Sequence, residues 1–250
     1  MTKPDPSLSF KAPPMERVTT KTGFQLKFCG GFWIAATDTS ILRFLLNPAA
    51  ALLGRGTYQF RQLNACLKLI PKDRRRVAID VGAHVGTWTR ILAGQFENVI
   101  ACEALPIHVE CLRFNVPNGN VRVIPYAISD KVGDVPFFND TVKGVMSRIA
   151  APGKPGHFNV HAEPLDALLQ YQERDKVDFI KIDVEGHELH VIKGAERTIR
   201  DNKPFIICEQ KDLAKDYDPN ESRFATVALL QKWGAKLLAS VGDDRILGWA

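Results

Sequence analysis

The stretch Val77–Gly86, with the sequence VAIDVGAHVG, places the strongest constraint on the fold. It begins as an apolar, β-branched run, reaches Asp80 and continues through Gly82, after which residues 87–96 carry apolar side chains at helical spacing. This order predicts a strand, a tight turn and a helix. In open α/β sheets such a turn lies at the carboxyl edge of a parallel strand, where ligands bind. We expect Gly82 to let a ligand approach the backbone and Gly86 to bring the helix close to the strand.

The next strand supplies a second signal for a ligand at this edge. Residues 98–102 predict a strand that is followed directly by Glu103. A carboxylate about 20 residues after the glycines accepts hydrogen bonds from ribose hydroxyls in nucleotide-binding sheets. Taken alone, Gly82 and Gly86 could serve only the turn, but the two signals together favour a nucleoside cofactor.

The spacing of the glycines distinguishes between nucleoside cofactors. Enzymes that bind a nicotinamide dinucleotide carry G-x-G-x-x-G, which opens the helix N-terminus to a pyrophosphate. This chain has Asp80-x-Gly82-x-x-x-Gly86 instead. A carboxylate there would repel a pyrophosphate and would suit a ligand that carries an ammonium and a sulfonium group. We therefore predict S-adenosylmethionine as the cofactor, bound by Asp80, Gly82, Ala83, Gly86 and Glu103.

A third strand, predicted over residues 121–124, precedes Ser129 and Asp130. At the end of this strand Asp130 could accept a hydrogen bond from the exocyclic amine of adenine, so both residues join the predicted cofactor site. A Ser-Asp turn that opens a hairpin toward residues 135–138 explains the same residues equally well. The sequence leaves both interpretations open.

A second informative stretch is VDFIKIDVEGHE, residues 177–188. It predicts a buried strand that ends at Asp183, a sharp turn at Gly186 and a following helix. Lys181 lies within the strand and should pair with a nearby acid, because an unpaired buried ammonium is costly. If the chain returns to the other side of the first strand, this turn faces the glycine turn. The side chains that would then surround the reacting atoms are Asp183, Glu185, His187 and Glu188. Asp183 would also contact the cofactor.

If the group that accepts the methyl is a hydroxyl, it must lose its proton during the transfer. A positioned base speeds that step by about 10²-fold to 10⁴-fold. Asp183 and His187, which titrates near neutral pH, are the candidate bases, with Glu185 beside them in the predicted catalytic set. Acids in a first helical turn also stabilise the helix dipole, by about 0.3 to 1 kcal/mol each, which explains Glu185 and Glu188 without chemistry. A Mg²⁺ ion held by Asp183, Glu185 and Glu209 is a less favoured alternative, and we assign no metal ligands.

Weaker patterns predict the remaining elements. One or two strands are expected at residues 24–36, helices at 41–53, 58–70 and 163–171, a loop bordering the substrate at 144–157, and a helix at 229–238 before a closing pair of antiparallel strands.

Composition sets the broad class of the protein. With 250 residues, 45% of them hydrophobic, the chain can bury the core of a large α/β domain, which we place at residues 55–250 after an N-terminal extension of residues 1–54. The net charge of +5 permits an anionic substrate or a weak contact with nucleic acid but argues for neither. A basic cluster at Lys72, Arg74, Arg75 and Arg76 is predicted to be a solvated rim at the opposite edge of the sheet.

The five cysteines lack C-x-x-C spacing, which argues against a disulfide framework or a zinc site and favours a reducing compartment. Polar residues interrupt the apolar region 30–54 well short of a membrane span, and residues 1–9 do not resemble a signal peptide. We expect a soluble, cytoplasmic protein. No pattern indicates its oligomeric state.

The segments AIDVGAHVGTWTRILA and VDFIKIDVEGHELHVIKGA, together with AISDKVGD and KPFIICEQ, resemble the FkbM-type methyltransferases over about residues 55–240. The resemblance implies a class I methyltransferase fold, which is an α/β, Rossmann-like, seven-stranded and mostly parallel sheet in the order 3-2-1-4-5-7-6 with helices on both faces. It also implies S-adenosylmethionine as methyl donor and O-methylation of hydroxyls on sugars, glycolipids or polyketides. The partner that the resemblance implies is therefore a small-molecule or glycan hydroxyl and not a nucleic acid. In CEALP, Ala104 and Leu105 separate Glu103 from Pro106, unlike the family's usual Glu-Pro, which puts the shape of the adenosine-side loop in question.

Three other functions stay open at this point. The missing third glycine and Asp80 disfavour a nicotinamide-dependent oxidoreductase, and the intact pair of motifs disfavours an inert adenosine-binding module. An RNA methyltransferase would share the cofactor chemistry and would lose RNA affinity steeply with salt.

Overall fold

The computed structural model describes residues 16–39, 41, 45, 59–116, 119–139, 147–151, 153–210, 222 and 224–249. Its centre is a seven-stranded sheet in the order β13-β14-β12-β11-β4-β5-β6. The strands are β4 (Val77–Val81), β5 (Asn98–Cys102), β6 (Val121–Ile124), β11 (Val177–Ile182), β12 (Phe205–Glu209), β13 (Lys236–Val241) and β14 (Asp244–Gly248). Numbered within the sheet and read from β6, this is 3-2-1-4-5-7-6, and β14 runs antiparallel to β12. The predicted fold class and strand order are therefore confirmed.

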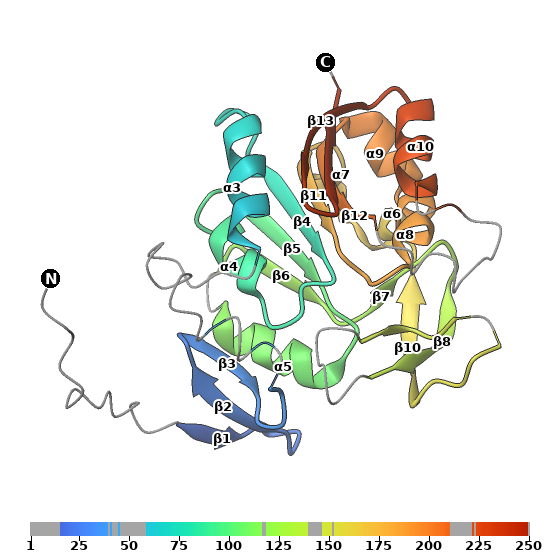
Figure 1. Cartoon of the computed structure of the whole chain (residues 1–250). Helices are drawn as coiled ribbons and strands as arrows, with labels where there is room; N and C mark the ends of the chain where they lie inside the picture. Colours follow the sequence, from blue (N-terminus) through green and yellow to red (C-terminus); the bar gives the residue numbers. More distant parts are fainter. Residues whose placement is uncertain are drawn as a thin grey trace, which may run out of the picture.

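Helices cover both faces of this sheet (Figure 1). One face carries α3 (Phe60–Leu69), α4 (Thr87–Leu92) and α5 (Pro106–Asn115), and the other carries α6 (Leu165–Leu168), α8 (Glu188–Gly194), α9 (Glu196–Asn202) and α10 (Ala225–Lys232), with the short α7 (Tyr171–Arg174) before β11. The alternation of side chains along β4 explains the two layers, because Val77, Ile79 and Val81 pack into one core cluster while Ala78 packs into the other.

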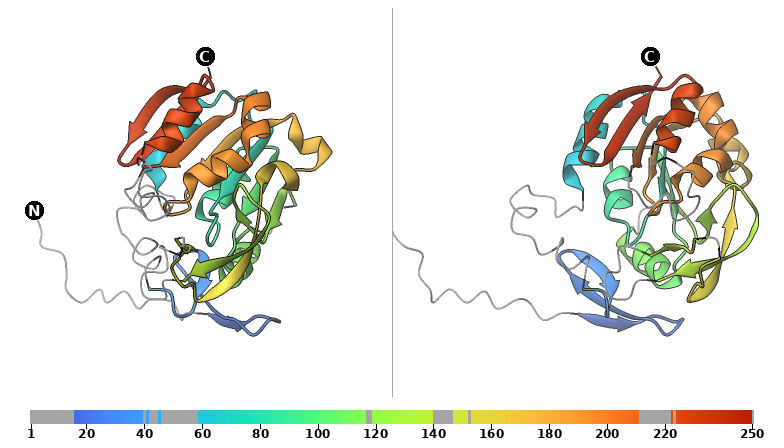
Figure 2. Two further views of the ribbon diagram at one scale, coloured as in Figure 1. Left: turned by 90° about the vertical axis from the view of Figure 1, so that its right-hand side faces the viewer. Right: turned by 45° about the vertical axis from the view of Figure 1, so that its right-hand side comes forward.

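Two smaller sheets flank the central one. Strands β1 (Arg17–Thr19), β2 (Gln25–Cys29) and β3 (Phe32–Ala35) form an antiparallel sheet beside α5, well away from the C-terminal strands (Figures 1 and 2). Strands β7 (Ala127–Ile128), β8 (Gly133–Phe138), β9 (Arg148–Ile149) and β10 (Phe158–Glu163) form the other, in the order β7-β10-β8-β9. Because β10 lies between β7 and β8, the hairpin considered for Ser129 and Asp130 is not formed.

Most predicted elements are present, and the differences have local causes. The strands around Gly30-Gly31 and the helix at 58–70 are confirmed, but only Ile41 and Leu45 of the helix at 41–53 are described, and both are helical. The helix predicted at 163–171 is present only as α6, because Glu163 still pairs with Ile128 in the small sheet and the helix ends at Leu168. The C-terminal helix ends at Lys232, before Gly234, and β13 begins at Lys236. The boundary proposed at residues 54–55 lies outside the described residues.

None of the described helices is long and apolar enough to cross a membrane. All five cysteines are free thiols, and Cys102 and Cys208 are buried within strands.

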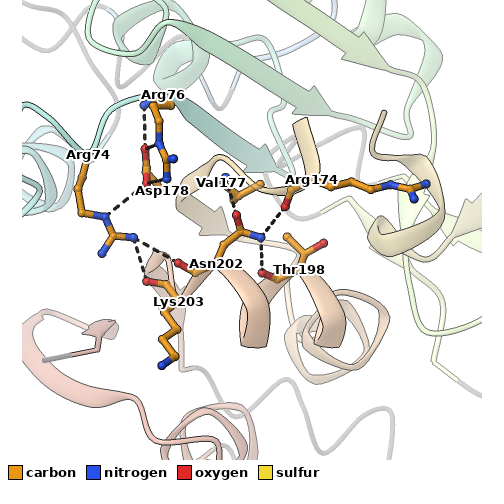
Figure 3. Close-up of polar contacts among 8 residues, drawn as sticks. All are labelled: Arg74, Arg76, Arg174, Val177, Asp178, Thr198, Asn202 and Lys203. Carbon is orange, nitrogen blue, oxygen red and sulfur yellow. Dashed lines mark hydrogen bonds and ion pairs between the residues drawn. The ribbon is translucent and has the colours of Figure 1, made fainter. Parts of the chain in front are cut away.

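The prediction that the basic cluster before β4 is a solvated rim is wrong for Arg74 and Arg76. Asp178, which is fully buried, accepts hydrogen bonds from the backbone N–H and the guanidinium of Arg76 at 2.7–2.9 Å and from Arg74 at 3.4 Å (Figure 3). Arg74 also donates to the carbonyls of Asn202 and Lys203. The cluster therefore fixes the amino ends of β4 and β11 to each other and to the end of α9.

We expect Asp178→Ala to lower the free energy of unfolding by about 3 kcal/mol, the low end for breaking a buried ion pair, because both arginines keep access to water. Chemical denaturation measures this change. Glu196→Ala, which removes the exposed partner of Arg200 in α9, is the matched control and should cost at most about 0.5 kcal/mol. Equal losses in the two variants would show that Asp178 does not fix the strand ends.

Candidate functional site

The two predicted corners lie side by side at the carboxyl edge of the sheet. Strands β4 and β11 are parallel neighbours with Ile182 opposite Val81, and the Asp183 N–H donates to the Val81 carbonyl at 3.1 Å. A Cβ placed on Gly82 would lie 2.0 Å from the Asp183 carbonyl oxygen. We expected Gly82 to admit a ligand, whereas in the structure its missing side chain admits the tip of β11. Gly86 similarly makes room for Leu112 of α5.

A cavity opens at this meeting point. The predicted site residues that line it are Gly82, Ala83, Glu103, Asp183, Glu185 and His187. The predicted cofactor residues Asp80, Gly86, Ser129 and Asp130 do not line it.

Asp80 is fully buried and is already neutralised by protein groups. Thr89 Oγ1 donates to its Oδ2 at 2.7 Å, and Lys181 Nζ lies 3.3 Å from its Oδ1. Lys181 also lies 3.7 Å from Asp183 Oδ2 and donates to the Gly82 carbonyl at 2.9 Å. The acid partner predicted for Lys181 is therefore confirmed. Asp80 does not line the cavity, so the geometry does not support its predicted contact with a sulfonium.

Glu103 is placed as a nucleoside acceptor should be. Its two carboxylate oxygens accept the backbone N–H groups of His84 and Leu105, each at 2.8 Å. Burial raises its pKa, but the contact with His108 and these two hydrogen bonds outweigh burial and hold the pKa below its usual value. A carboxylate has about four lone-pair sites, so the two backbone N–H groups and His108 leave an acceptor position for a ribose hydroxyl. Leu105, one of the two extra residues in CEALP, thus holds the loop against the Glu103 carboxylate.

Ser129 and Asp130 pack against α8 rather than along the cavity. Ser129 Oγ lies 3.0 Å from His187 Nε2, and Asp130 Oδ1 lies 3.1 Å from His190 Nδ1. The backbone of Ser129 comes so close to Gly194 that a Cβ there would meet it at 1.9 Å. The adenine contact predicted for Asp130 therefore has no support in the geometry of the cavity.

His187 is a buried imidazole stacked on His190, with ring centroids 4.4 Å apart. Burial, and next the neighbouring His190, lower its pKa to about 3. A general base works best with a pKa near the operating pH. The low pKa of His187 therefore argues against His187 as the base.

The other acids of the second motif differ in role. Glu188 accepts hydrogen bonds from the backbone N–H groups of Val184 and Gly186, and burial raises its pKa to about 7, so it serves the turn. Glu185 lines the cavity in a left-handed conformation with φ +54°, which a non-glycine residue rarely adopts. Carboxylate oxygens of Asp183, Glu185 and Glu209 lie within 4.8 Å of one another, so the three oxygen ligands considered for Mg²⁺ do come together.

Several residues that line the cavity were not predicted. His84, also left-handed with φ +52°, belongs to the glycine turn. The ring of His108 lies against it at a tilt of 58°, with the ring centroids 3.9 Å apart. Their imidazoles and the Asp38 carboxylate offer donor atoms within 4.8 Å of one another. The small sheet adds the unpredicted side chains Phe137, Arg148 and Ile149. The histidine inside the glycine turn was the available signal for His84. Nothing local marked the others, although the loop predicted at 144–157 does border the cavity through its described residues.

We expect Gly82→Ala to lower the free energy of unfolding by about 3 kcal/mol or more, because the new Cβ collides with the backbone of β11 and the residue keeps φ +78°. Gly23→Ala is the control, since Gly23 has φ +87° but no atom within 4 Å of the added Cβ. It should cost only about 1 to 2 kcal/mol. A urea titration of both variants compares the costs, and equal values would contradict the close approach.

His187 should also make stability depend on pH. An unfolded histidine binds a proton near pH 6.5, whereas folded His187 binds one only near pH 3. Folding is therefore opposed as the pH falls through this window, and the wild type should lose up to about 1.4 kcal/mol per pH unit relative to His187→Gln between about pH 6 and 4. Denaturation at several pH values measures the difference. Ser129→Ala keeps the buried imidazole and should keep the wild-type slope, and parallel curves for wild type and His187→Gln would contradict the interpretation.

Comparisons with known proteins agree with this geometry. The family model described as the methyltransferase FkbM domain matches residues 80–237. The hexuronic acid methyltransferase AglP of Haloferax volcanii is 33% identical over 137 residues, which cover 52% of this chain and 54% of that protein. The solved structure of methyltransferase FkbM from Methylobacillus flagellatus KT is similar with a TM-score of 0.50 at 18% identity, over 84% of this chain and 53% of that one.

The matched part thus spans about half the length of each of these two relatives, and the structural similarity supports the fold alone. The match to the family model covers more than half of the chain. It begins at Asp80, within the first strand-and-turn motif, and contains the whole of the second. This protein belongs to the family of methyltransferases with an FkbM domain.

Proposed function

We propose that this protein transfers the methyl group of S-adenosylmethionine to a hydroxyl of a sugar or a related small metabolite. The observation that carries the proposal is that a single cavity contains the glycine turn after β4, Glu103 after β5 and Asp183 after β11. Ligands of open α/β sheets bind at this switch point.

The cofactor half of the cavity is assigned to the side nearest β4 and β5. Gly82 and Ala83 line the cavity on this side, and Glu103 provides ribose acceptors beside them. Membership of a methyltransferase family supports S-adenosylmethionine over a nicotinamide dinucleotide. The motif also lacks the third glycine of dinucleotide-binding turns.

The acceptor half is assigned to Asp183, Glu185 and the wall built by the small sheet. Aromatic Tyr126 and Phe137 give this wall apolar area, and Arg148 adds hydrogen-bond donors. Such a mixed lining suits a sugar, whose faces are apolar and whose edges are hydroxylated. A relative named for a hexuronic acid supports the same class of acceptor.

The reaction depends mainly on the alignment of the acceptor oxygen with the methyl group. S-adenosylmethionine supplies an activated methyl group when it is bound, so the protein has to hold the acceptor oxygen in line and exclude water. Asp183 takes the hydroxyl proton through its carboxylate, which lies at the tip of β11 inside the cavity. His187, with its low pKa, stays neutral and orients the turn through its contact with Ser129.

The experiment that tests the function combines binding and transfer. Calorimetry should show S-adenosylmethionine binding, and a methyl-labelled donor should pass its label to hydroxyls in a mixture of sugars and sugar acids, identified by mass spectrometry. Binding of NAD in place of S-adenosylmethionine would support the oxidoreductase instead. Label recovered only in RNA would support an RNA methyltransferase.

We expect Glu103→Ala to weaken S-adenosylmethionine binding by about 1.5 to 3 kcal/mol, or roughly 10-fold to 150-fold, through the loss of charged hydrogen bonds to the ribose. Calorimetry on the two proteins gives the ratio. Glu110→Ala on α5, which removes a surface partner of Arg113, should leave the affinity unchanged. An unchanged affinity in Glu103→Ala would remove Glu103 from the cofactor site.

A further inference from the structure

We infer that Gln59 is the positioning residue for Asp183, because its amide lies between the indole of Trp88 and the Asp183 carboxylate. This inference rests on the proposed role of Asp183 as the base. It concerns a residue that no sequence motif indicated and that lies more than a hundred positions away along the chain.

The contacts of Gln59 fix the orientation of its amide. Trp88 Nε1 donates to Gln59 Oε1 at 3.1 Å, and Gln59 Nε2 donates to Asp183 Oδ2 at 3.3 Å. An indole N–H is only a donor, so it must face the amide oxygen, and the amide nitrogen must then face the carboxylate. Because Nε2 can only donate, Asp183 Oδ2 is required to be an acceptor. The arrangement favours the ionised carboxylate, which is the form that a base needs.

The anchor behind Gln59 is rigid. Trp88 is buried and stacks on Phe179 with nearly parallel rings. An amide that is held by a core side chain loses little additional freedom when it binds the carboxylate, so it can define the position of that oxygen.

The backbone of Gln59 is itself strained, which supports a specific role. Gln59 has φ +57° immediately before α3, and among the described non-glycine residues only His84, Glu185 and Lys203 share a positive φ. His84 and Glu185 both line the cavity. Strained residues persist where the surroundings fix them, and here the two side-chain bonds of Gln59 do so.

The consequence for Asp183 is an asymmetric carboxylate. Within the described chain, the hydrogen bond from Gln59 and the ion pair with Lys181 both fall on Oδ2. The other oxygen, Oδ1, is then the one that takes the proton of the acceptor hydroxyl. Gln59 contributes by holding the first oxygen, not by touching the acceptor.

The decisive test measures the ionisation of Asp183 directly in the full chain. The protein is labelled with ¹³C at aspartate carboxyl groups, and the Asp183 signal is identified by its loss in Asp183→Asn. In Gln59→Leu the pH at which the Asp183 carboxyl signal titrates should rise, because a hydrogen bond to the charged form is lost. In Gln59→Glu, which has nearly the same shape and still accepts from Trp88, the rise should be larger because two carboxylates face each other.

The chain offers a matched control on the same helix. Gln62 Nε2 donates to Asp244 Oδ2 at 3.1 Å, which is the same kind of bond. Gln62→Leu should leave the pKa of Asp183 unchanged. An Asp183 pKa that is the same in wild type and in both Gln59 variants would overturn the inference, and Gln59→Glu decides the matter if Gln59→Leu does not fold.

A transfer assay separates this inference from the proposed function. With the sugar acceptor that the labelled-donor experiment identifies, Gln59→Leu should lower kcat about 10-fold or more and change KM for S-adenosylmethionine by less than about 2-fold. A change in KM alone would overturn the positioning role. Absence of transfer by the wild type to every hydroxyl would refute the proposed function, while the titration of Asp183 would still decide the contact with Gln59.

Discussion

A single buried ammonium group holds the two halves of the site together. Lys181 Nζ donates to the Gly82 carbonyl and lies within ion-pair distance of both Asp80 and Asp183. Without this cation, two carboxylates and a carbonyl would crowd at one edge of the sheet with no compensating charge, which is costly in a buried position. The side-by-side arrangement of the two turns, and therefore the cavity between them, depends on this interaction together with the missing side chain of Gly82.

The opposite edge of the same two strands uses the reverse distribution of charge. There a buried carboxylate, Asp178, is held by Arg74 and Arg76. Strands β4 and β11 are thus fixed at both ends by charged groups and along their length by a parallel ladder of hydrogen bonds. A pair held in this way presents its carboxyl ends at a defined separation, which a site built from two distant segments requires.

The family resemblance implied the order of the sheet. Local sequence patterns predicted the three strand-tip residues Gly82, Glu103 and Asp183, because strand, turn and helix signals are local. The contact proposed for Asp80 could have been questioned from the sequence itself. With a period of two along β4, Asp80 shares the face of Ala78, and that face packs under α3 and α4.

Other features depend on pairings that a single sequence does not encode. The bonds of Asp130 to His190 and of Gln59 to Asp183 join segments 60 and 124 residues apart. The basic run before β4 appeared as surface charge because its partner, Asp178, lies in a different motif.

The small sheet β7-β10-β8-β9 gives the architecture a modular character. Phe137, Arg148 and Ile149 contribute one wall of the cavity, yet β8 and β9 do not pair with the seven-stranded sheet. Substitutions on that wall reshape the space offered to a ligand while leaving the central ladder and its charged anchors intact. Selectivity for a ligand can therefore change without loss of stability in the scaffold, because the two properties depend on separate segments of the chain.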